Sequence, residues 1–525
     1  MKTRAILRLM GILTAPPVRL PSIYQTSRRN QSFFPPRGDY PLKIAPISDT
    51  KPGMRNRGLE FANIYAGKAL IADPIHQYAW FTVPDPACPG EKTEKDLLDT
   101  PWLQRLRRIH QLQSARWVYP AAEHSRFQHS LGTMHMAGEF SRHLYPSLKS
   151  VCPDAPSIHF IEELARLAGL LHDVGHGPFG HFFDDHFLDQ YGITHEDLGR
   201  KIILKKLART IAAVRRSPTG PFEKGETLDP AHVAYLIKMP EGRDGRQPRW
   251  LELLRQLFSG VYTADNLDYV QRDAFMTGFS LDMVDISRLR FYTFFTEKGI
   301  TLHQAGISAL SRFLNARLNL YRNVYYHRTT RALDLHLQEI FRDTMNRLLP
   351  GDPSKFLDDY LECDEWTLFR DVQRWPRDKD PLKRTLGRQW EKLHNREVKW
   401  KMSFVTELSI DELPRGIRFS GERDYEDEIR RHLPRELRRR PFRVDLATQD
   451  PRPLNPITEE NKRINIYNPA TGITSPEPLV DLYRFIPARV VHFRVFALSH
   501  DHDEAMAEAA EKALGSLAGQ SKTNI

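Results

Sequence analysis

Apolar residues recur at helical spacing through the central part of the chain. Just before residue 172 they fall on one face of a helix, three and four positions apart: Leu164, Leu167, Ala168 and Leu171. The same pattern predicts helices at about 129–147, 160–173, 195–215, 250–259, 263–277 and 305–348. A further helix is expected to start at Asp99-Thr-Pro101 and to run through Leu112, because a capping side chain precedes proline in the first turn. These elements predict a mainly helical core.

Strand-like alternation appears in shorter stretches. Residues 78–83 are expected to form a strand, and 292–296 with 299–302 a hairpin between helices. After about residue 395 the pattern changes, with strands expected at 397–404, 463–467 and 490–496 and a last helix at Asp503–Leu517. We therefore expect a mainly α fold in three parts: a basic, disordered segment over 1–60, a helical core over 61–395, and a small α+β module over 396–525.

Composition narrows the class of protein. The 525 residues are 40% hydrophobic and 27% charged, with a formal net charge of +10. No apolar run approaches the ~18 residues that a membrane helix needs, so no membrane partner is expected. Three widely spaced cysteines without a CxxC pair favour a reducing, cytoplasmic location over a disulfide framework or a thiolate zinc site. The first acid is Asp39, which leaves a mitochondrial presequence or a nuclear location as alternatives to a flexible basic tail.

The richest candidate chemistry lies between Leu170 and His181. His172 and Asp173 end an apolar helical run, and His176 and His181 follow among glycines. His172 and His176 would face one side if the helix continues. A buried imidazole beside a buried carboxylate is costly unless a cation lies between them, and a divalent metal is the simplest such cation.

Three other segments offer similar side chains. They contain Arg126 and His129, then His195, and then a set at spacings of three and four along one helix side: Asp265, Asp268, Tyr269, Arg272 and Asp273. Taken singly, each has a plainer interpretation, as a hydrogen-bonded histidine or a solvated helix face. The basic run Arg430–Arg440 is likewise expected to be a solvated face or linker, with an anion-binding site as the alternative.

In this order the segments resemble the H…HD…D pattern of the HD-domain phosphohydrolases. The resemblance is strongest to the deoxynucleoside-triphosphate triphosphohydrolase branch, in particular the catalytic core of its animal members with a sterile alpha motif. It covers about residues 68–345 and includes the strings Asp73-Pro-Ile-His76, Arg126-Phe-Gln-His-Ser-Leu-Gly132, His172-Asp-Val-Gly-His-Gly-Pro-Phe179, Thr194-His-Glu196 and Tyr325-Tyr-His-Arg328. The last 130 or so residues match only loosely.

The resemblance implies a metal-dependent hydrolysis of deoxynucleoside triphosphates to deoxynucleoside and triphosphate. The implied metal ligands are His129, His172, Asp173 and Asp265. Such nitrogen and oxygen donors could hold Fe, Mn, Mg, Zn or Ni, and the sequence does not choose among them.

It also implies roles for ten further residues. His195 would be the general acid, oriented by Asp184, with His176 and His181 in contact with phosphate or water. Arg126 and Arg317 would clamp phosphate, since a guanidinium binds an oxyanion at two points. Tyr269 and Asp273 would face the sugar, and Gln111 and Leu112 the sugar and base.

Regulation and assembly are further implications. Asp99, Gln104 and Arg107 match residues that hold an activating guanine nucleotide, although capping or packing would also explain them. A homodimer or homotetramer is expected. Where the animal members carry a phosphate-binding lysine, this chain has Asn266, so that cationic contact is either missing or supplied elsewhere, with Arg322 and Arg328 as the candidates.

Two other functions stay open. One is an HD-domain phosphohydrolase or phosphodiesterase acting on another nucleotide. The other is a nucleic-acid-binding protein that uses the basic N-terminal segment and Arg430–Arg440.

Overall fold

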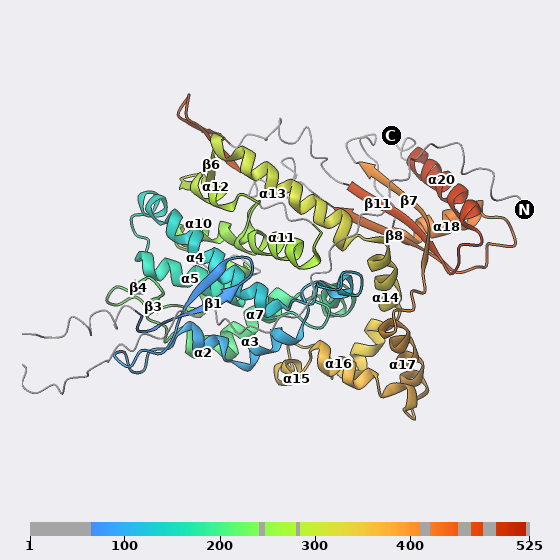
Figure 1. The fold of residues 1–525 in the computed structure, drawn as a ribbon, viewed down its shortest axis with the longest axis horizontal. Helices are drawn as coiled ribbons and strands as arrows, with labels where there is room; N and C mark the ends of the chain where they lie inside the picture. The colour runs from blue at the N-terminus through green and yellow to red at the C-terminus, as the bar shows by residue number, and fades with distance from the viewer. Residues whose placement is uncertain are drawn as a thin grey trace, which may run out of the picture. The chain divides into compact units, whose positions relative to one another are not determined.

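The computed structural model describes residues 65–240, 247–279, 284–409, 421–449, 464–475 and 490–520. The expected N-terminal segment 1–60 lies outside them. Within them, the mainly α fold with some β structure is confirmed (Figure 1). No helix among the described residues is long and apolar enough to cross a membrane.

Helices α4 (Arg126–Val151) and α5 (Ile158–Leu171) form the centre of the core and pack along each other. Every residue of α5 from Phe160 to Leu171 is buried, since its flanks are covered by α9 (Pro230–Ile237) and other elements. Helix α11 (Ala264–Thr277) lies against α4 (Figure 1). The site residues of three distant segments are therefore carried by adjoining helices.

The remaining core helices surround this centre. They are α2 (Glu94–Leu98), α3 (Pro101–Arg105), α6 (His181–His186), α7 (His195–Ile202), α8 (Ala208–Ile211), α10 (Arg249–Ser259), α12 (Ile286–Phe291), α13 (Ile307–Leu320), α14 (Arg328–Leu348), α15 (Leu357–Leu361), α16 (Glu365–Val372) and α17 (Pro381–His394). Two short antiparallel pairs flank them: β1 (Lys68–Asp73) with β2 (Gln77–Thr82), and β3 (Arg216–Ser217) with β4 (Gly220–Pro221).

Several predicted helices end earlier than expected. The helix predicted through Leu112 is wrong beyond Arg105, because a 3₁₀ turn follows and His110 bridges to Ser125 in extended backbone. The single helix predicted over 305–348 is two helices, α13 and α14, joined by a π turn at Tyr321–Tyr325. The helix at 195–215 likewise ends at Ile211, after a π turn at Ile203–Leu207.

The C-terminal module has a sheet and a core of its own. Strands β7 (Lys401–Ser409), β11 (Val490–Ala497) and β8 (Phe442–Gln449) pair antiparallel in that order. Helices α18 (Glu422–His432) and α20 (Asp503–Gln520) cover the sheet (Figure 1). Their buried side chains form one apolar cluster: Tyr425, Ile429, Leu433, Leu437, Phe442, Val444, Phe493, Val495, Met506, Ala509, Ala510 and Ala513.

One predicted strand of the module joins the core instead. Strand β9 (Asn465–Asn468) pairs parallel with β6 (Gly299–His303), which forms the expected hairpin with β5 (Thr293–Thr296). Strand β10 (Ile473–Ser475) extends that sheet. Core and module group as one unit, Ala62–Ile525, so the expected boundary at residue 395 stays a prediction.

Candidate metal and nucleotide site

His129, His172 and Asp265 converge from α4, the end of α5 and α11. The Nε2 of His129 lies 3.0 Å from Asp265 Oδ1 and 3.2 Å from the Nε2 of His172. His172 Nε2 is 3.7 Å from the same Asp265 oxygen. Asp173 is adjacent, with its Oδ1 3.2 Å from His172 Nε2. Ligand atoms of His129, His172 and Asp265 therefore lie within 4.8 Å of one another, and Asp173 adjoins this group without being part of it.

The second nitrogen of each imidazole fixes which atom faces the other ligands. His172 Nδ1 donates to Gly169 O at 2.8 Å, and His129 Nδ1 donates to Asp268 Oδ2 at 2.8 Å. Because a carbonyl and a carboxylate only accept, both Nε2 atoms carry lone pairs in the neutral rings. Two lone pairs 3.2 Å apart repel unless a cation lies between them. The donor set thus fits a first-row divalent metal.

Electrostatics favour positive charge at the same place. Burial disfavours a charged His129, yet its hydrogen bonds to Asp265 and Asp268 raise the pKa of this histidine to about 10. In this environment a cation, whether proton or metal, is bound strongly.

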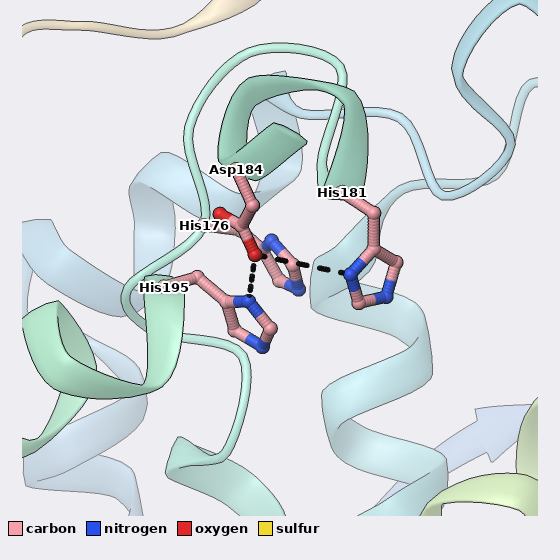
Figure 2. Close-up of side chains that lie close together, drawn as sticks. All are labelled: His176, His181, Asp184 and His195. Carbon is pink, nitrogen blue, oxygen red and sulfur yellow. Dashed lines mark hydrogen bonds and ion pairs between the residues drawn. The ribbon is translucent and has the colours of Figure 1, made fainter. Parts of the chain in front are cut away.

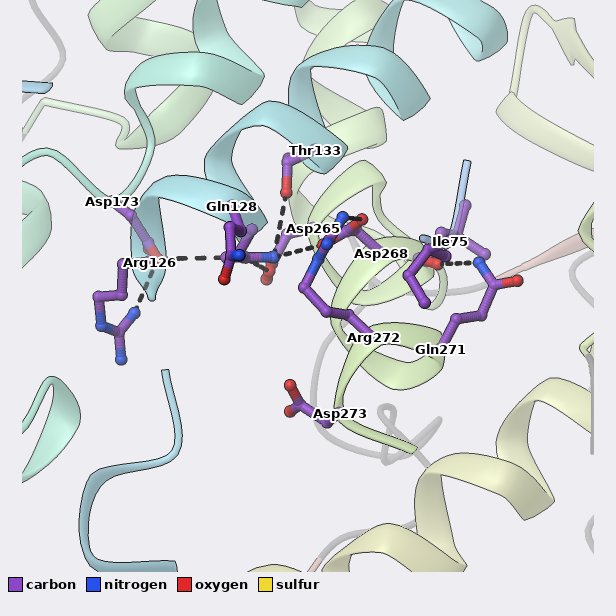
Figure 3. Close-up of polar contacts among 12 residues, drawn as sticks. Ile75, Arg126, Gln128, Thr133, Asp173, Asp265, Asp268, Gln271, Arg272 and Asp273 are labelled. Carbon is purple, nitrogen blue, oxygen red and sulfur yellow. Dashed lines mark hydrogen bonds and ion pairs between the residues drawn. The ribbon is translucent and has the colours of Figure 1, made fainter. Parts of the chain in front are cut away.

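Asp268 orients His129 from behind. This fully buried carboxylate accepts hydrogen bonds from His129 Nδ1, from His76 Nε2 at 2.6 Å, and from Arg272 Nε and Nη2 at 2.9 and 2.8 Å. Arg272 also donates to Asp73 at 2.9 Å. Figure 3 shows Arg272 beside Asp268. Gly132 is required here, because a Cβ at this position would lie 1.9 Å from Asp268 Oδ1. Sequence analysis predicted that Asp268 and Arg272 share one side of a helix, but it did not predict this role.

Asp268→Asn is expected to weaken metal binding by about 10- to 100-fold. The amide nitrogen of asparagine would present N–H hydrogens to groups that are themselves N–H donors. His129 Nδ1 would then lose the acceptor that fixes the tautomer of its ring. Metal content after dialysis against graded chelator, with circular dichroism as the fold check, measures the effect. Gln271→Ala on the same helix is the control, since Gln271 bonds only to Leu267 O. Wild-type metal affinity in Asp268→Asn would contradict the role.

A second cluster adjoins the first and comprises His176, His181, Asp184 and His195 (Figure 2). Asp184 pairs with His195 Nδ1, which leaves His195 Nε2 free to give or take a proton. The His176 ring stacks on His195 at 3.6 Å, and burial together with Arg126 holds the pKa of His176 well below its usual range. His181 is exposed, 3.9 Å from Asp184.

The turn between the two clusters corrects one expectation. Helix α5 ends at Leu171, so His172 and His176 are not on one continuing helix face. The chain instead turns tightly, and His176 Nε2 comes to 3.3 Å from Asp173 Oδ1. Gly175 makes the turn possible, because a Cβ there would lie 2.0 Å from the backbone O of His195 and 2.4 Å from Gly199 N.

Gly175→Ala is therefore expected to destabilise the fold by about 1–3 kcal/mol, because backbone atoms must move apart. Denaturant unfolding measures this, and Gly515→Ala is the control, since no atom lies within 4 Å of its added Cβ. Equal unfolding midpoints for the two variants would contradict this prediction, because they would mean that the turn accommodates a Cβ at residue 175.

All six expected substrate contacts line one cavity of about 720 Å³. They are Gln111, Leu112, Arg126, Tyr269, Asp273 and Arg317. Asp265 and His181 line it as well, so it opens onto both clusters. Gln111 Oε1, Arg317 Nη1 and Thr330 Oγ1 are buried there without a hydrogen-bond partner among the residues that the structure describes. The size and the unpaired polar atoms suit a nucleotide-sized polar ligand.

Two of these side chains also have partners within the protein. Arg126 Nη1 donates to Asp173 Oδ2 at 2.7 Å, so it supports a metal ligand as well as facing the cavity. Asp273 accepts from His124 Nε2 at 2.8 Å and from Tyr325 Oη at 2.5 Å. Sequence reasoning missed His124 and Tyr325 as partners of Asp273.

Asn266 does not face a phosphate position. Its Oδ1 accepts from Thr263 N at 2.7 Å and its N donates to Thr263 Oγ1 at 3.2 Å, which closes a capping box at the start of α11. Among the described residues that line the cavity, neither Arg322 nor Arg328 is found, and Arg322 pairs with Glu407 at 2.9 Å. The expectation that they replace the lysine therefore has no structural support.

The three residues expected to bind an activator lie apart from this cavity. Asp99 pairs with Lys95 at the surface, and Thr100, not Asp99, caps α3. Gln104 donates to Leu98 O at 2.7 Å and accepts from Arg107 at 2.8 Å. Gln104 also lines a separate cavity of about 430 Å³. These contacts suit the capping and packing alternative, and the activator site stays a prediction.

Comparison with known proteins fits this geometry. Residues 126–248 match the HD domain family, a span that includes His129, His172, Asp173 and His195. The chain contains an HD domain. Asp265 lies beyond the matched span and is brought to it by α11.

Relatives extend the likeness beyond the length of the HD domain. The uncharacterized protein YwfO of Bacillus subtilis is 29% identical over 335 residues, 61% of this chain and 69% of that one. The deoxynucleoside triphosphate triphosphohydrolase SAMHD1 homolog of Dictyostelium discoideum is 26% identical over 300 residues, 55% of this chain and 52% of that one. SAMHD1 of Bos taurus is 27% identical over 300 residues, 52% and 47% of the two chains. The match thus spans about half the length of these SAMHD1 proteins.

A solved structure shows the same fold over most of the chain. A hypothetical protein from Aquifex aeolicus superposes with a TM-score of 0.59 at 21% identity, covering 85% of this chain and 100% of that one.

Proposed function

We propose that this HD-domain protein is a metal-dependent phosphohydrolase that cleaves deoxynucleoside triphosphates to deoxynucleoside and triphosphate. The observation that carries the proposal is the approach of His129 Nε2 and His172 Nε2 to 3.2 Å beside Asp265, which lines a nucleotide-sized cavity. The names of the SAMHD1 relatives support the choice of substrate.

Each residue then has a chemical task. His129, His172, Asp173 and Asp265 would hold a divalent ion, which would supply polarisation of the α-phosphate and activation of water. His195, with Asp184 on its Nδ1, gives a proton to the leaving 5′-oxygen. Arg126 and Arg317 hold phosphate oxygens, Tyr269 packs against C2′, and Asp273 accepts the 3′-hydroxyl. Gln111 and Leu112 meet the sugar and base.

Product analysis tests the proposal. Purified protein is incubated with each of the four deoxynucleoside triphosphates, with and without Mn²⁺ and GTP, and products are separated by chromatography. Deoxynucleoside with intact triphosphate supports it. Orthophosphate or pyrophosphate release, or cleavage only of another nucleotide, would favour the alternative HD-domain phosphohydrolase, which the capping role of Asn266 leaves open.

Activation and assembly are part of the same proposal. A guanine nucleotide bound near Asp99, Gln104 and Arg107 would raise the rate in the GTP arm of that experiment, and light scattering would detect a dimer or tetramer. No effect of GTP would favour the capping role of these residues.

A further inference from the structure

The C-terminal module forms part of the wall of the same cavity. Glu422 at the start of α18 and Leu446 and Ala447 on β8 line it, together with residues of the HD core. Opposite them, α14 presents one stripe at helical spacing: Arg331, Asp334, Leu335 and Gln338. The module is therefore a structural part of the candidate nucleotide site.

One ion pair and two hydrogen bonds hold the module against the helical core. Arg331 donates to Asp445 on β8, with its Nη2 2.5 Å from Oδ1, and Asp445 is fully buried. Arg494 on β11 contacts the same carboxylate at 3.3 Å and donates to Tyr326 O at 2.8 Å. Arg443 donates to Gln338 at 3.2 Å. Since a buried pair is costly to break, this wall is fixed in place.

The cavity lining differs in its cationic groups between its two parts. Arg126 and Arg317 line the part that adjoins the metal cluster, together with the carboxylates of Asp265 and Asp273. Along α14 and the module the lining offers the carboxyl groups of Asp334 and Glu422, the amide of Gln338, and apolar Leu446 and Ala447. Arg331, the cation on this side, is already paired with Asp445. A triphosphate suits the first part, and a flat, largely apolar group with N–H donors suits the second.

We propose that the C-terminal module is the base-reading wall of the nucleotide cavity, with Glu422 accepting N–H hydrogens of the base and Leu446 packing against its ring. This inference rests on the proposed function and adds the origin of base preference to it. A carboxylate binds two parallel N–H groups, which guanine presents side by side, whereas thymine presents one N–H between two carbonyls. The wall thus favours dGTP over dTTP.

Helix α18 supplies a matched pair of variants. Glu422 and Glu426 lie one turn apart, and each accepts a backbone N–H of β8, from Leu446 at 3.2 Å and from Val444 at 3.0 Å. Of the two, Glu422 lines the cavity. A glutamine side chain can still accept the backbone N–H of β8, so Glu422→Gln and Glu426→Gln both preserve this hydrogen bond. They differ because the side chain changed in Glu422→Gln lines the cavity.

The test is the ratio of kcat/KM for dGTP to that for dTTP in the full-length protein. Glu422→Gln is expected to lower this ratio by about tenfold, the worth of one hydrogen bond to a charged group, while Glu426→Gln leaves it unchanged. Leu446→Ala is expected to raise KM for all four substrates at unchanged metal content.

If the wild-type enzyme is active, an unchanged dGTP-to-dTTP ratio in Glu422→Gln together with an unchanged KM in Leu446→Ala would overturn this inference. The proposed function would not be affected. A wild-type protein that cleaves no deoxynucleoside triphosphate would instead overturn the proposed function. In that case, calorimetric affinities for dGTP and dTTP in the same variants decide the inference, and no binding of either nucleotide refutes it.

Discussion

Asp265→Asn is expected to remove the bound metal and to lower turnover by at least about a thousandfold. Asp265 Oδ1 lies 3.0 Å from His129 Nε2 and 3.7 Å from His172 Nε2, so it is the anionic donor between the two imidazoles. An amide keeps the shape but loses the charge that balances a divalent ion. Metal content by mass spectrometry and rate of triphosphate release measure the two losses on one sample.

His172→Ala should give the same double loss, because it removes the imidazole whose Nδ1 is fixed by Gly169 O. Asp358→Asn is the control: its side chain is exposed and pairs with Lys206 far from the cavity. Full metal content in Asp265→Asn would remove the basis for the proposed site.

His195→Ala is expected to lower kcat by about 10²- to 10⁴-fold, the usual worth of a general acid, while metal content stays at the wild-type level. In its cluster, His195 is the imidazole paired directly with Asp184, and its neighbour His176 is buried and held neutral. A substrate with a p-nitrophenolate leaving group needs no proton, so for that substrate the loss is expected to be small.

The metal measurement separates two roles for this cluster. Its four side chains place ligand atoms within 4.8 Å of one another, a spacing that could also hold an ion. If His195→Ala loses metal in proportion to activity, the cluster is a second metal site and the division of tasks between the clusters is wrong. An equal loss on the p-nitrophenyl substrate would also exclude the general-acid role.

Sequence periodicity predicted where helices lie better than where they break. The positions of α4, α5 and α11 follow from helical spacing in the sequence, although α5 is buried on all sides from Phe160 to Leu171. The break between α13 and α14 was missed because apolar and aromatic residues continue through Tyr321–Tyr325, and a π turn leaves no mark in composition. Strand β9 was assigned to the module because alternation does not identify the partner strand.

The candidate site was predictable as a set of residue types but not as a network. The His172-Asp173 pair at the end of an apolar helix can be recognised as a candidate metal site from the sequence alone. The role of Asp268 depends on His76, His129 and Arg272 meeting at one carboxylate, which no spacing along the chain reveals. The cavity wall made by Glu422 and Leu446 was missed for a related reason: it lies beyond residue 345, where the likeness to the known family ends.

The early end of α5 has an electrostatic consequence. Because the helix stops at Leu171 and His172 follows as its cap, the negative pole of a 14-residue helix macrodipole is directed at the two imidazoles. That pole corresponds to roughly half an elementary charge, and the buried surroundings leave it little screened by salt. It attracts a cation and repels an approaching phosphate. We therefore expect an ion held by these residues to bind before the nucleotide, because its charge would offset this negative potential.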